Sequence, residues 1–274
     1  MTDPAQRLLR RLDLERGDDT EDAVIWHGRA GEGALNINDA IYGGMVLAQT
    51  IVAAGRTVPD RSVHSISQMF LRAGRADVPL TYRCSTLYGG RRYSMLEVRV
   101  LQEGDVISHA QVGLTGGADG PDRHDPPVAD RAPIEDTVDR DVLFARKRAG
   151  DQPVEVRVIA DRATDASPSL ETYVKPNGAL PEDPLIHQAF LAWVSDRGFM
   201  RTAWKPHDDE SDYRGATLDH SMWFHRPVVF DDWHMYSMHS PSIADGRGLI
   251  LGSIHAGDGT HVASTAQQGN YRPI

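Results

Sequence analysis

The feature that most limits how this chain can fold is a plan of elements that occurs twice along it. In each half, one long apolar segment of helical character is followed by several strand-like runs. Short motifs also recur at nearly one spacing. They are Phe70-x-Arg72 and Phe224-x-Arg226, 154 residues apart, and Ala110-Gln111-x-Gly113 and Ala266-Gln267-x-Gly269, 156 residues apart. Two matches at nearly the same offset indicate an internal duplication, so we expect two fused, similar units.

The first half predicts one enclosed helix and a series of strands. Residues 42–55, YGGMVLAQTIVAAG, are apolar nearly all round, and a helix without a polar face is normally enclosed by protein. Gly43 and Gly44 stand at its start. The predicted strands, bounded by Gly, Pro, Asp or Asn, cover 23–30, 62–72, 80–88, 93–102 and 106–114.

The second half repeats this plan. In EDPLIHQAFLAWVSDRGF, Asp183 can cap a helix whose first turn takes Pro184, and Gly198 suits its end. Helical spacing of apolar residues runs through Ile186, Ala189, Phe190, Trp193 and Val194. The predicted strands cover 154–160, 170–175, 216–226, 232–239, 246–255 and 261–268. One long helix wrapped by an antiparallel sheet in each unit makes the chain α+β.

A segment between the halves has the composition of a linker. Residues 116–137 are rich in Pro, Gly and Asp and lack periodicity. We therefore expect an N-terminal unit over 1–115, a linker over 116–150 and a C-terminal unit over 151–274.

Composition excludes several classes of function. The 29 Lys and Arg against 39 Asp and Glu give a net charge of −10, which argues against general binding to nucleic acid or anionic membranes. No run approaches the roughly 18 apolar residues of a membrane span. Because Cys84 is the one cysteine, neither an intramolecular disulfide nor a thiolate metal cluster is possible. A cytoplasmic location is the simplest expectation.

The stretch GATLDHSMWFHRP, residues 215–227, concentrates polar and aromatic side chains. As a regular strand it places alternate residues on opposite faces, with Thr217 and Asp219 on one face and His220 on the other. His220 and His225 are five apart and so point opposite ways, which excludes joint metal binding from one strand. Without a His-Glu-x-x-His motif elsewhere, we expect no metal site.

Asp196 is unusual for its place in the sequence. It falls in the last turn of the second predicted helix, where the helix dipole disfavours an anion. A carboxylate at such a position either reaches solvent or has a function.

Several passages together resemble the acyl-CoA thioesterase II family, the bacterial double-hotdog thioesterases. They are AWVSDRGF, GATLDHSMWFHRP, HSPSIADGRGL and HVASTAQQG in the second half and, more loosely, YGGMVLAQT, VHSISQMFLR and GDVISHAQVGL in the first. The resemblance extends over most of the chain and implies a double hotdog fold. It departs at Met69, where the family commonly has an aromatic residue, and in the unusually basic turn 88–94.

The resemblance also implies a catalytic group and a reaction. The aspartate, threonine and glutamine with which the family activates water match Asp196, Thr217 and Gln267, all in the C-terminal unit. It implies hydrolysis of acyl-CoA thioesters, with neither a cofactor nor a metal. Asp219, His220 and Trp223 are then expected to build the strand. Backbone N–H groups at a helix start stabilise the oxyanion in hotdog enzymes, which makes Gly43 and Gly44 candidates.

Further expectations concern binding and assembly. Coenzyme A carries phosphates, and Arg91 and Arg92 in the turn 88–94 are candidates to bind them. Two alternatives stay open: a hotdog enoyl-CoA hydratase, because EDPLIHQAF faintly resembles the hydratase motif, and a non-catalytic acyl-CoA binding protein. Because hotdog sheets expose edges, we expect a homodimer or larger assembly.

Overall fold

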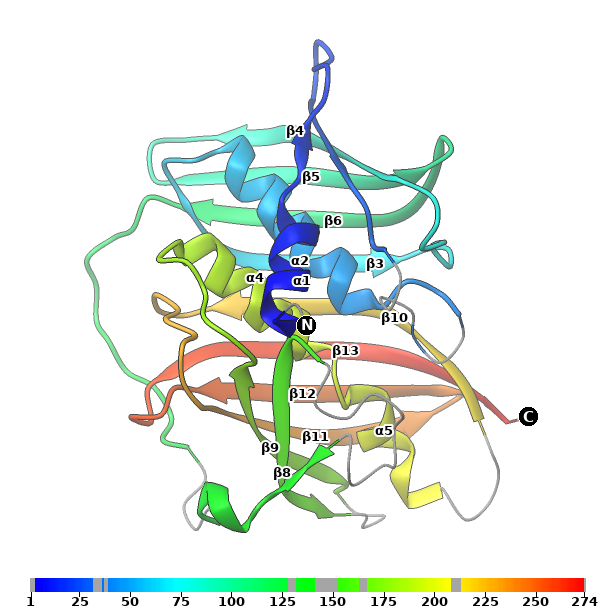
Figure 1. The fold of residues 1–274 in the computed structure, drawn as a ribbon, viewed down its shortest axis with the longest axis vertical. Helices are drawn as coiled ribbons and strands as arrows, with labels where there is room; N and C mark the ends of the chain where they lie inside the picture. The colour runs from blue at the N-terminus through cyan, green and yellow to red at the C-terminus, as the bar shows by residue number, and fades with distance from the viewer. Residues whose placement is uncertain are drawn as a thin grey trace.

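The structure, a computed structural model, describes residues 3–31, 36, 39–127, 132–140, 152–162, 167–207 and 213–273. Within these residues the strands form one antiparallel sheet of thirteen (Figure 1). The helices α1 (Pro4–Leu12), α2 (Gly43–Thr57) and α4 (Pro184–Ser195) lie on one side of it. The predicted α+β class is confirmed.

The two halves of the chain build the two halves of the sheet. The first half supplies β1 (Glu15–Arg16), β2 (Val24–Gly28), β3 (Ser62–Phe70), β4 (Leu80–Gly89), β5 (Tyr93–Gln102) and β6 (Asp105–Thr115). The second supplies β7 (Val138–Asp139), β8 (Val154–Arg162), β9 (Ser169–Pro176), β10 (Tyr213–Phe224), β11 (His234–Ala244), β12 (Arg247–His255) and β13 (His261–Pro273). Shorter elements are α5 (Phe199–Trp204) and the 3₁₀ turns η1 (Ile134–Asp136) and η2 (Lys205–His207).

The strand order shows the same connectivity twice. In the first half, α2 is followed by β3 at the centre of the sheet, and the order outward is β3-β6-β5-β4. In the second half, α4 is followed by β10 at the centre, and the order outward is β10-β13-β12-β11. The predicted repeat of elements is therefore present in the topology.

The two halves meet where β3 pairs with β10. The antiparallel register aligns Ser67 with Ser221, whose hydroxyl oxygens lie 2.9 Å apart. These two residues are 154 positions apart, which is the offset of the first repeated motif. Equivalent residues of the two units thus face each other at the centre, as an internal two-fold relation requires.

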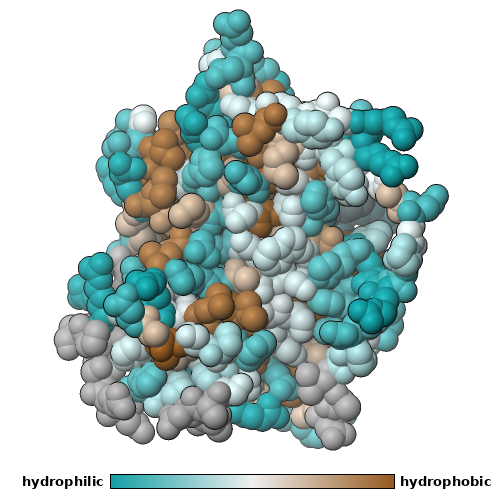
Figure 2. Space-filling model, turned by 180° about the vertical axis from the view of Figure 1, so that it is seen from behind, coloured by the Kyte–Doolittle hydropathy of each residue, from teal (hydrophilic) through white to brown (hydrophobic). Residues whose placement is uncertain are grey.

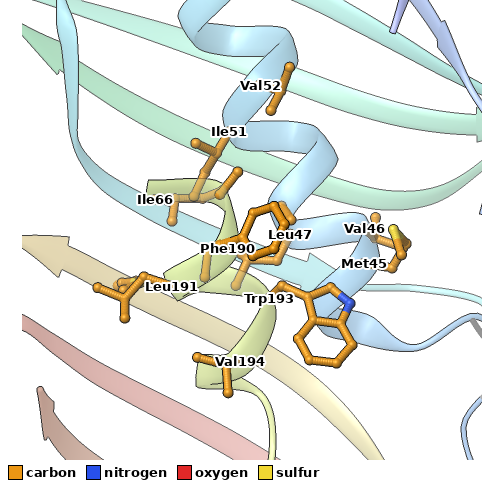
Figure 3. Packing of buried hydrophobic residues seen from close by; sticks show 14 of the residues in the cluster. Met45, Val46, Leu47, Ile51, Val52, Ile66, Phe190, Leu191, Trp193 and Val194 are labelled. Atoms are coloured by element: carbon orange, nitrogen blue, oxygen red, sulfur yellow. The ribbon is translucent and has the colours of Figure 1, made fainter. Parts of the chain in front are cut away.

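The helices α2 and α4 pack against each other inside the curve of the sheet. Figure 3 shows side chains of both helices meeting, among them Leu47 and Ile51 of α2 and Phe190 of α4. All three are fully buried, and each is worth roughly 2 kcal/mol of burial energy. A Cβ atom on Gly44 would collide with the backbone oxygen of Trp193, and one on Gly55 with the Leu185 side chain. The helices are therefore antiparallel, and α2 begins beside the end of α4.

The predicted elements agree with the structure to within a few residues. The largest differences are at β11, which ends at Ala244, and β13, which ends at Pro273, both further than predicted. Asp183 caps α4 by accepting a hydrogen bond from the Leu185 N–H at 2.9 Å, as predicted. The short strands β1 and β7 and the helices α1 and α5 were not predicted.

The linker range 116–150 is only partly described. Its described residues include η1 and β7, which pairs with β8, while 128–131 and 141–150 lie outside the described residues. The division into units at this range stays a prediction. Of the helices in the described residues, none has the length and apolar character needed to cross a membrane.

Candidate active site

Asp196 follows the last residue of α4 and faces the first turn of α2. Its Oδ2 accepts a hydrogen bond from the Gly44 N–H at 2.9 Å. The carboxylate thus stands at the C-terminus of one helix and at the N-terminus of another, whose dipole and free N–H groups favour an anion. This contact resolves the unusual position of Asp196 in the sequence.

Two tyrosines, the half-buried Tyr42 and the buried Tyr236, cover the carbonyl end of α4. The Tyr42 hydroxyl donates to the Trp193 carbonyl and the Tyr236 hydroxyl to the Ser195 carbonyl, each at 2.8 Å. Burial raises the pKa of both phenols well above its usual value, so both remain donors at neutral pH. These donors satisfy two of the last carbonyls of α4, which have no partner inside the helix.

The pKa of Asp196 is raised to about 7. Burial of the carboxyl group is the main cause, and hydrogen bonds from Gly44, Gln267 and Thr217 partly offset it. Asp196 as a residue is half-buried, while its carboxyl group is held by these hydrogen bonds. Near neutral pH this carboxyl group can therefore both take up and release a proton.

Thr217 and Gln267 lie beside Asp196. Thr217 Oγ1 is 3.5 Å from Asp196 Oδ1, and Gln267 Nε2 donates to Thr217 Oγ1 at 3.0 Å. Gln267 is completely buried. The three residues come from the end of α4 and from the paired strands β10 and β13, so the structure brings the predicted catalytic group together.

A β-bulge in β10 corrects the predicted alternation of faces. Opposite β13, Thr217 pairs with Gly269 and Asp219 with Gln268, so β10 has one extra residue at Leu218. Beyond the bulge the alternation changes phase. As a result Thr217 and His220 both point toward the helices, and the prediction that they lie on opposite faces was wrong.

The side chain of Asp219 supports this bulge. Its Oδ1 accepts a hydrogen bond from the Gln268 N–H at 3.3 Å, across the irregular pair. This contact is consistent with the expected structural role of Asp219. It also explains how the sequence LDH can place Thr217 and His220 on one face.

His220 has a larger part in the site than the sequence indicated. It is fully buried, with Nδ1 2.7 Å from Gln267 Oε1 and Nε2 2.9 Å from Ser195 Oγ. Burial lowers its pKa to about 4, so the ring is neutral at pH 7. The available signal was a histidine among apolar residues, Met222 and Phe224, at alternate positions of β10, and the assumption of a regular strand concealed its contact with the site.

Gly43 and Gly44 begin α2 directly against the carboxylate. A Cβ atom on Gly43 would lie 2.9 Å from Asp196 Oδ2, so a side chain there would crowd the carboxylate. The Gly44 N–H already donates to Asp196. Gly43, as the first residue of the helix, has an N–H without a partner inside the helix. Both glycines therefore lie at the candidate site. The Gly44 N–H is bound to Asp196, and the Gly43 N–H has no partner inside the helix.

Arg91 and Arg92 lie far from this group. They are in the turn between β4 and β5, where Arg61, just after the end of α2, donates to the Gly90 carbonyl. The carboxylate is at the other end of α2, and a helix of 15 residues is about 22 Å long. The structure does not bring these arginines to Asp196, and their role in binding phosphate stays a prediction.

The residues that resembled a hydratase motif have other partners. Asp183 caps α4, and His187 Nδ1 accepts a hydrogen bond from the Phe230 N–H at 2.8 Å. His187 Nε2 lies 3.0 Å from the Pro181 carbonyl oxygen. These side chains are at the opposite end of α4 from Asp196, which argues against a hydratase site. Among the described residues, no cluster of His, Cys, Asp and Glu is arranged to hold a metal.

Comparison with known proteins gives matches over both halves of the chain. Residues 143–270 match the family described as acyl-CoA thioesterase, and residues 32–115 match the acyl-CoA thioesterase N-terminal domain. Acyl-CoA thioesterase 2 of Haemophilus influenzae is 32% identical, with 99% of each chain covered. Acyl-coenzyme A thioesterase 8 of Mus musculus is 31% identical over 85% of this chain and 80% of its own.

Solved structures agree with this assignment. The acyl-CoA thioesterase II TesB2 of Mycobacterium marinum superposes with a TM-score of 0.82 at 28% identity, covering 97% of this chain and 98% of its own. A TesB protein of Mycobacterium avium subspecies paratuberculosis gives 0.83 at 24% identity, covering 98% and 100%, and shows the shared fold. The fold is the expected double hotdog, and the chain belongs to the acyl-CoA thioesterase family.

Proposed function

We propose that this chain hydrolyses acyl-CoA thioesters with Asp196 as general base and with Thr217 and Gln267 orienting the attacking water. Its membership of the acyl-CoA thioesterase family makes it a thioester hydrolase. The observation that supports the residue assignment is one buried carboxyl group, with a pKa of about 7, in contact with both other side chains.

The proposed reaction has two steps. Water attacks the thioester carbonyl carbon while its proton passes to the Asp196 carboxylate. The tetrahedral intermediate then collapses, the carbon–sulfur bond breaks, and Asp196 returns the proton to the departing thiolate. The products are a carboxylic acid and coenzyme A. Thr217 and Gln267 lower the entropic part of the barrier by holding the water in place.

The oxyanion of the intermediate needs a hydrogen-bond donor. Of the two candidate glycines we favour Gly43, because the Gly44 N–H is engaged by Asp196. The Gly43 N–H stands at the positive end of α2, close to the carboxylate that delivers the nucleophile.

The substrate, assembly and location that we propose follow the sequence expectations. The substrate is an acyl-CoA, and the protein works as a homodimer or larger assembly. We place it in the cytoplasm, consistent with a single cysteine whose thiol is buried.

The experiment is an assay of free coenzyme A release over a series of acyl-CoA chain lengths, with the wild type and Asp196→Asn. The variant keeps the shape of the side chain and removes the base, so kcat should fall by at least about 10²-fold. Circular dichroism serves as the control for folding. Undiminished turnover in a folded variant contradicts the assignment of Asp196.

A further inference from the structure

A chain of hydrogen-bonded polar side chains runs through the site. It begins at Ser195 and ends at Asp196, the proposed base. Ser195 Oγ is 2.9 Å from His220 Nε2, and His220 Nδ1 is 2.7 Å from Gln267 Oε1. Gln267 Nε2 is 3.0 Å from Thr217 Oγ1, which is 3.5 Å from Asp196 Oδ1. The ends of the chain, Ser195 and Asp196, are neighbours in sequence.

The direction of the hydrogen bonds follows from the chemistry of each group. An amide oxygen only accepts, so the hydrogen of neutral His220 is on Nδ1, which faces Gln267 Oε1. Nε2 is then an acceptor, and the Ser195 hydroxyl donates to it, sharing its hydrogen with the Ala192 carbonyl oxygen 2.8 Å away. From Ser195 onward, every donor points along the chain toward the Asp196 carboxylate.

The orientation of the Gln267 amide decides whether the Thr217 hydroxyl can donate its hydrogen toward Asp196. If the amide were turned over, Oε1 would take the hydroxyl hydrogen of Thr217, and the lone pairs of Thr217 would face the carboxylate. That arrangement repels an ionised base. As it stands, the Thr217 hydroxyl hydrogen is free to point to Asp196 or to a water beside it.

We propose that His220 is a positioning residue for the hydrolysis: its Nδ1–H holds Gln267 in the orientation that directs Nε2 toward Thr217. This inference rests on the proposed function of Gln267. The histidine is completely buried and acts through the glutamine.

The surroundings of His220 suit this role. The edge-to-face contact with the buried Phe199, at 5.5 Å between ring centroids, fixes the plane of the imidazole. The groups facing the ring are Ser195 from α4, Phe199 from α5 and Gln267 from β13. None of these carries a charge, so the ring keeps its single proton and its direction of donation across neutral pH.

The test separates positioning from simple packing. His220→Ala should lower kcat by about tenfold, a barrier increase of about 1.4 kcal/mol, with KM little changed. In a Gln267→Ala background the same substitution should cause little further loss, because its partner is gone. His187→Ala is the matched control: it also removes a buried histidine with two partners, but at the far end of α4, and should leave kcat of the folded protein unchanged.

The pH profile supplies a readout that packing alone does not move. Hydrogen bonds from Gln267 and Thr217 lower the pKa of Asp196, so weakening them raises it. The acid limb of kcat/KM should therefore move to higher pH in His220→Ala. The other titratable groups acting on Asp196 are Arg197 and Tyr42, along with Tyr236.

Two polar substitutions keep the test decisive if His220→Ala does not fold. Asn places an amide N–H near the position of Nδ1, and Gln places one near Nε2, so His220→Asn should retain more of kcat than His220→Gln. Equal kcat values for the two overturn the inference. If Gln267→Ala is impaired while folded His220→Ala keeps the wild-type kcat and pH profile, only the role of His220 is lost. Wild-type kcat in Gln267→Ala overturns the proposed water orientation as well.

Discussion

The proton affinity of Asp196 sets the pH dependence of the reaction. Because burial raises its pKa to about 7 and only the carboxylate can act as a base, kcat/KM should rise with pH through about 7 and level off above it. A profile of kcat/KM between pH 5 and 9 measures this. A flat profile over that range contradicts the assignment, since an ordinary exposed aspartate has a pKa near 3.9.

The same raised pKa makes Asp196 a cost to stability at neutral pH. Between the unfolded value, about 3.9, and about 7, the folded protein holds a proton that the unfolded chain has released. The contribution of this residue to the free energy of unfolding therefore falls as pH rises through that window. Asp196→Asn should raise Tm relative to the wild type at pH 8 and much less at pH 5. Thermal melts at the two pH values check this, and a Tm lowered at both contradicts it.

Thr217 and Gln267 are expected to act on one water as a unit. Thr217→Ala and Gln267→Ala should each lower kcat more than they raise KM, by about tenfold or more. Because the two side chains are hydrogen-bonded to each other, the double variant should lose less than the product of the single losses. Steady-state kinetics of the three variants provide the measurement. Fully multiplicative losses show that the residues work independently.

At the scale of elements, the contact between the start of α2 and the end of α4 builds the site. Gly44→Ala puts a methyl group against the Trp193 carbonyl oxygen, which is backbone and cannot move away locally. We expect α2 to be pushed from Asp196, lowering both Tm and kcat. The control is Gly55→Ala at the other end of the same helix, where the added methyl meets the flexible Leu185 side chain.

The comparison of these two variants separates stability from catalysis. Gly55→Ala should lower Tm less than Gly44→Ala and leave kcat of the folded protein unchanged. Melting curves and turnover per folded molecule distinguish them. If the two variants lower kcat equally, catalysis depends on the distance between the two helices in general and not on the contact of Gly44 with Asp196.

Elements that depend on local pattern were predictable from the sequence, and contacts between elements were not. The apolar run 42–55 and the Asp183 cap gave both helices, and the repeated motifs gave the repeated topology. The bulge at Leu218 was not predictable from alternation, because it depends on pairing with β13. The position of Asp196 was identified as unusual, yet its explanation, the Gly44 N–H, comes from a helix about 150 residues earlier.

The proposed catalytic residues come from a family resemblance, and the structure adds a neighbour, His220, to which the resemblance gave only a structural role. Neither spacing nor composition links His220 to Gln267, because the two residues meet only through the register of β10 against β13. The phosphate-binding role expected for two arginines is a different case. Arg91 and Arg92 are adjacent in the sequence, but their turn lies beyond the far end of α2 from the carboxylate.

At the scale of the whole molecule, the edges of the sheet are only partly covered: among the described residues, β7 pairs with β8 at Arg157 and Val158 alone. Among the described residues its outermost strands are β1 and β7, each of two residues. Such short edge strands discourage the addition of another sheet. The homodimer expected from exposed edges stays a prediction, and the faces of the sheet are the other surface that an assembly can use.

The outer face of the sheet, turned away from α2 and α4, is the surface that suits a second copy. At its centre Met69 of β3 and Trp223 of β10 are 53% and 43% exposed. In Figure 2 the middle of this face is mostly pale with brown patches, and the most hydrophilic residues gather toward the rim. In a chain of net charge −10, two copies can approach most easily where apolar side chains are exposed.

We therefore predict a homodimer or larger assembly that buries this face. Light scattering at assay concentration should give at least twice the monomer mass. Trp223→Glu should reduce it, because a charge at the centre of a buried contact is costly. Val229→Glu, at an exposed apolar residue in the loop after β10, is the control and should leave the mass unchanged.

A wild-type protein that is monomeric throughout contradicts the assembly, and a dimer insensitive to Trp223→Glu shows that the contact lies elsewhere. Because the Asp196 carboxylate lies on the helix side of the sheet, a monomeric Trp223→Glu should retain its kcat.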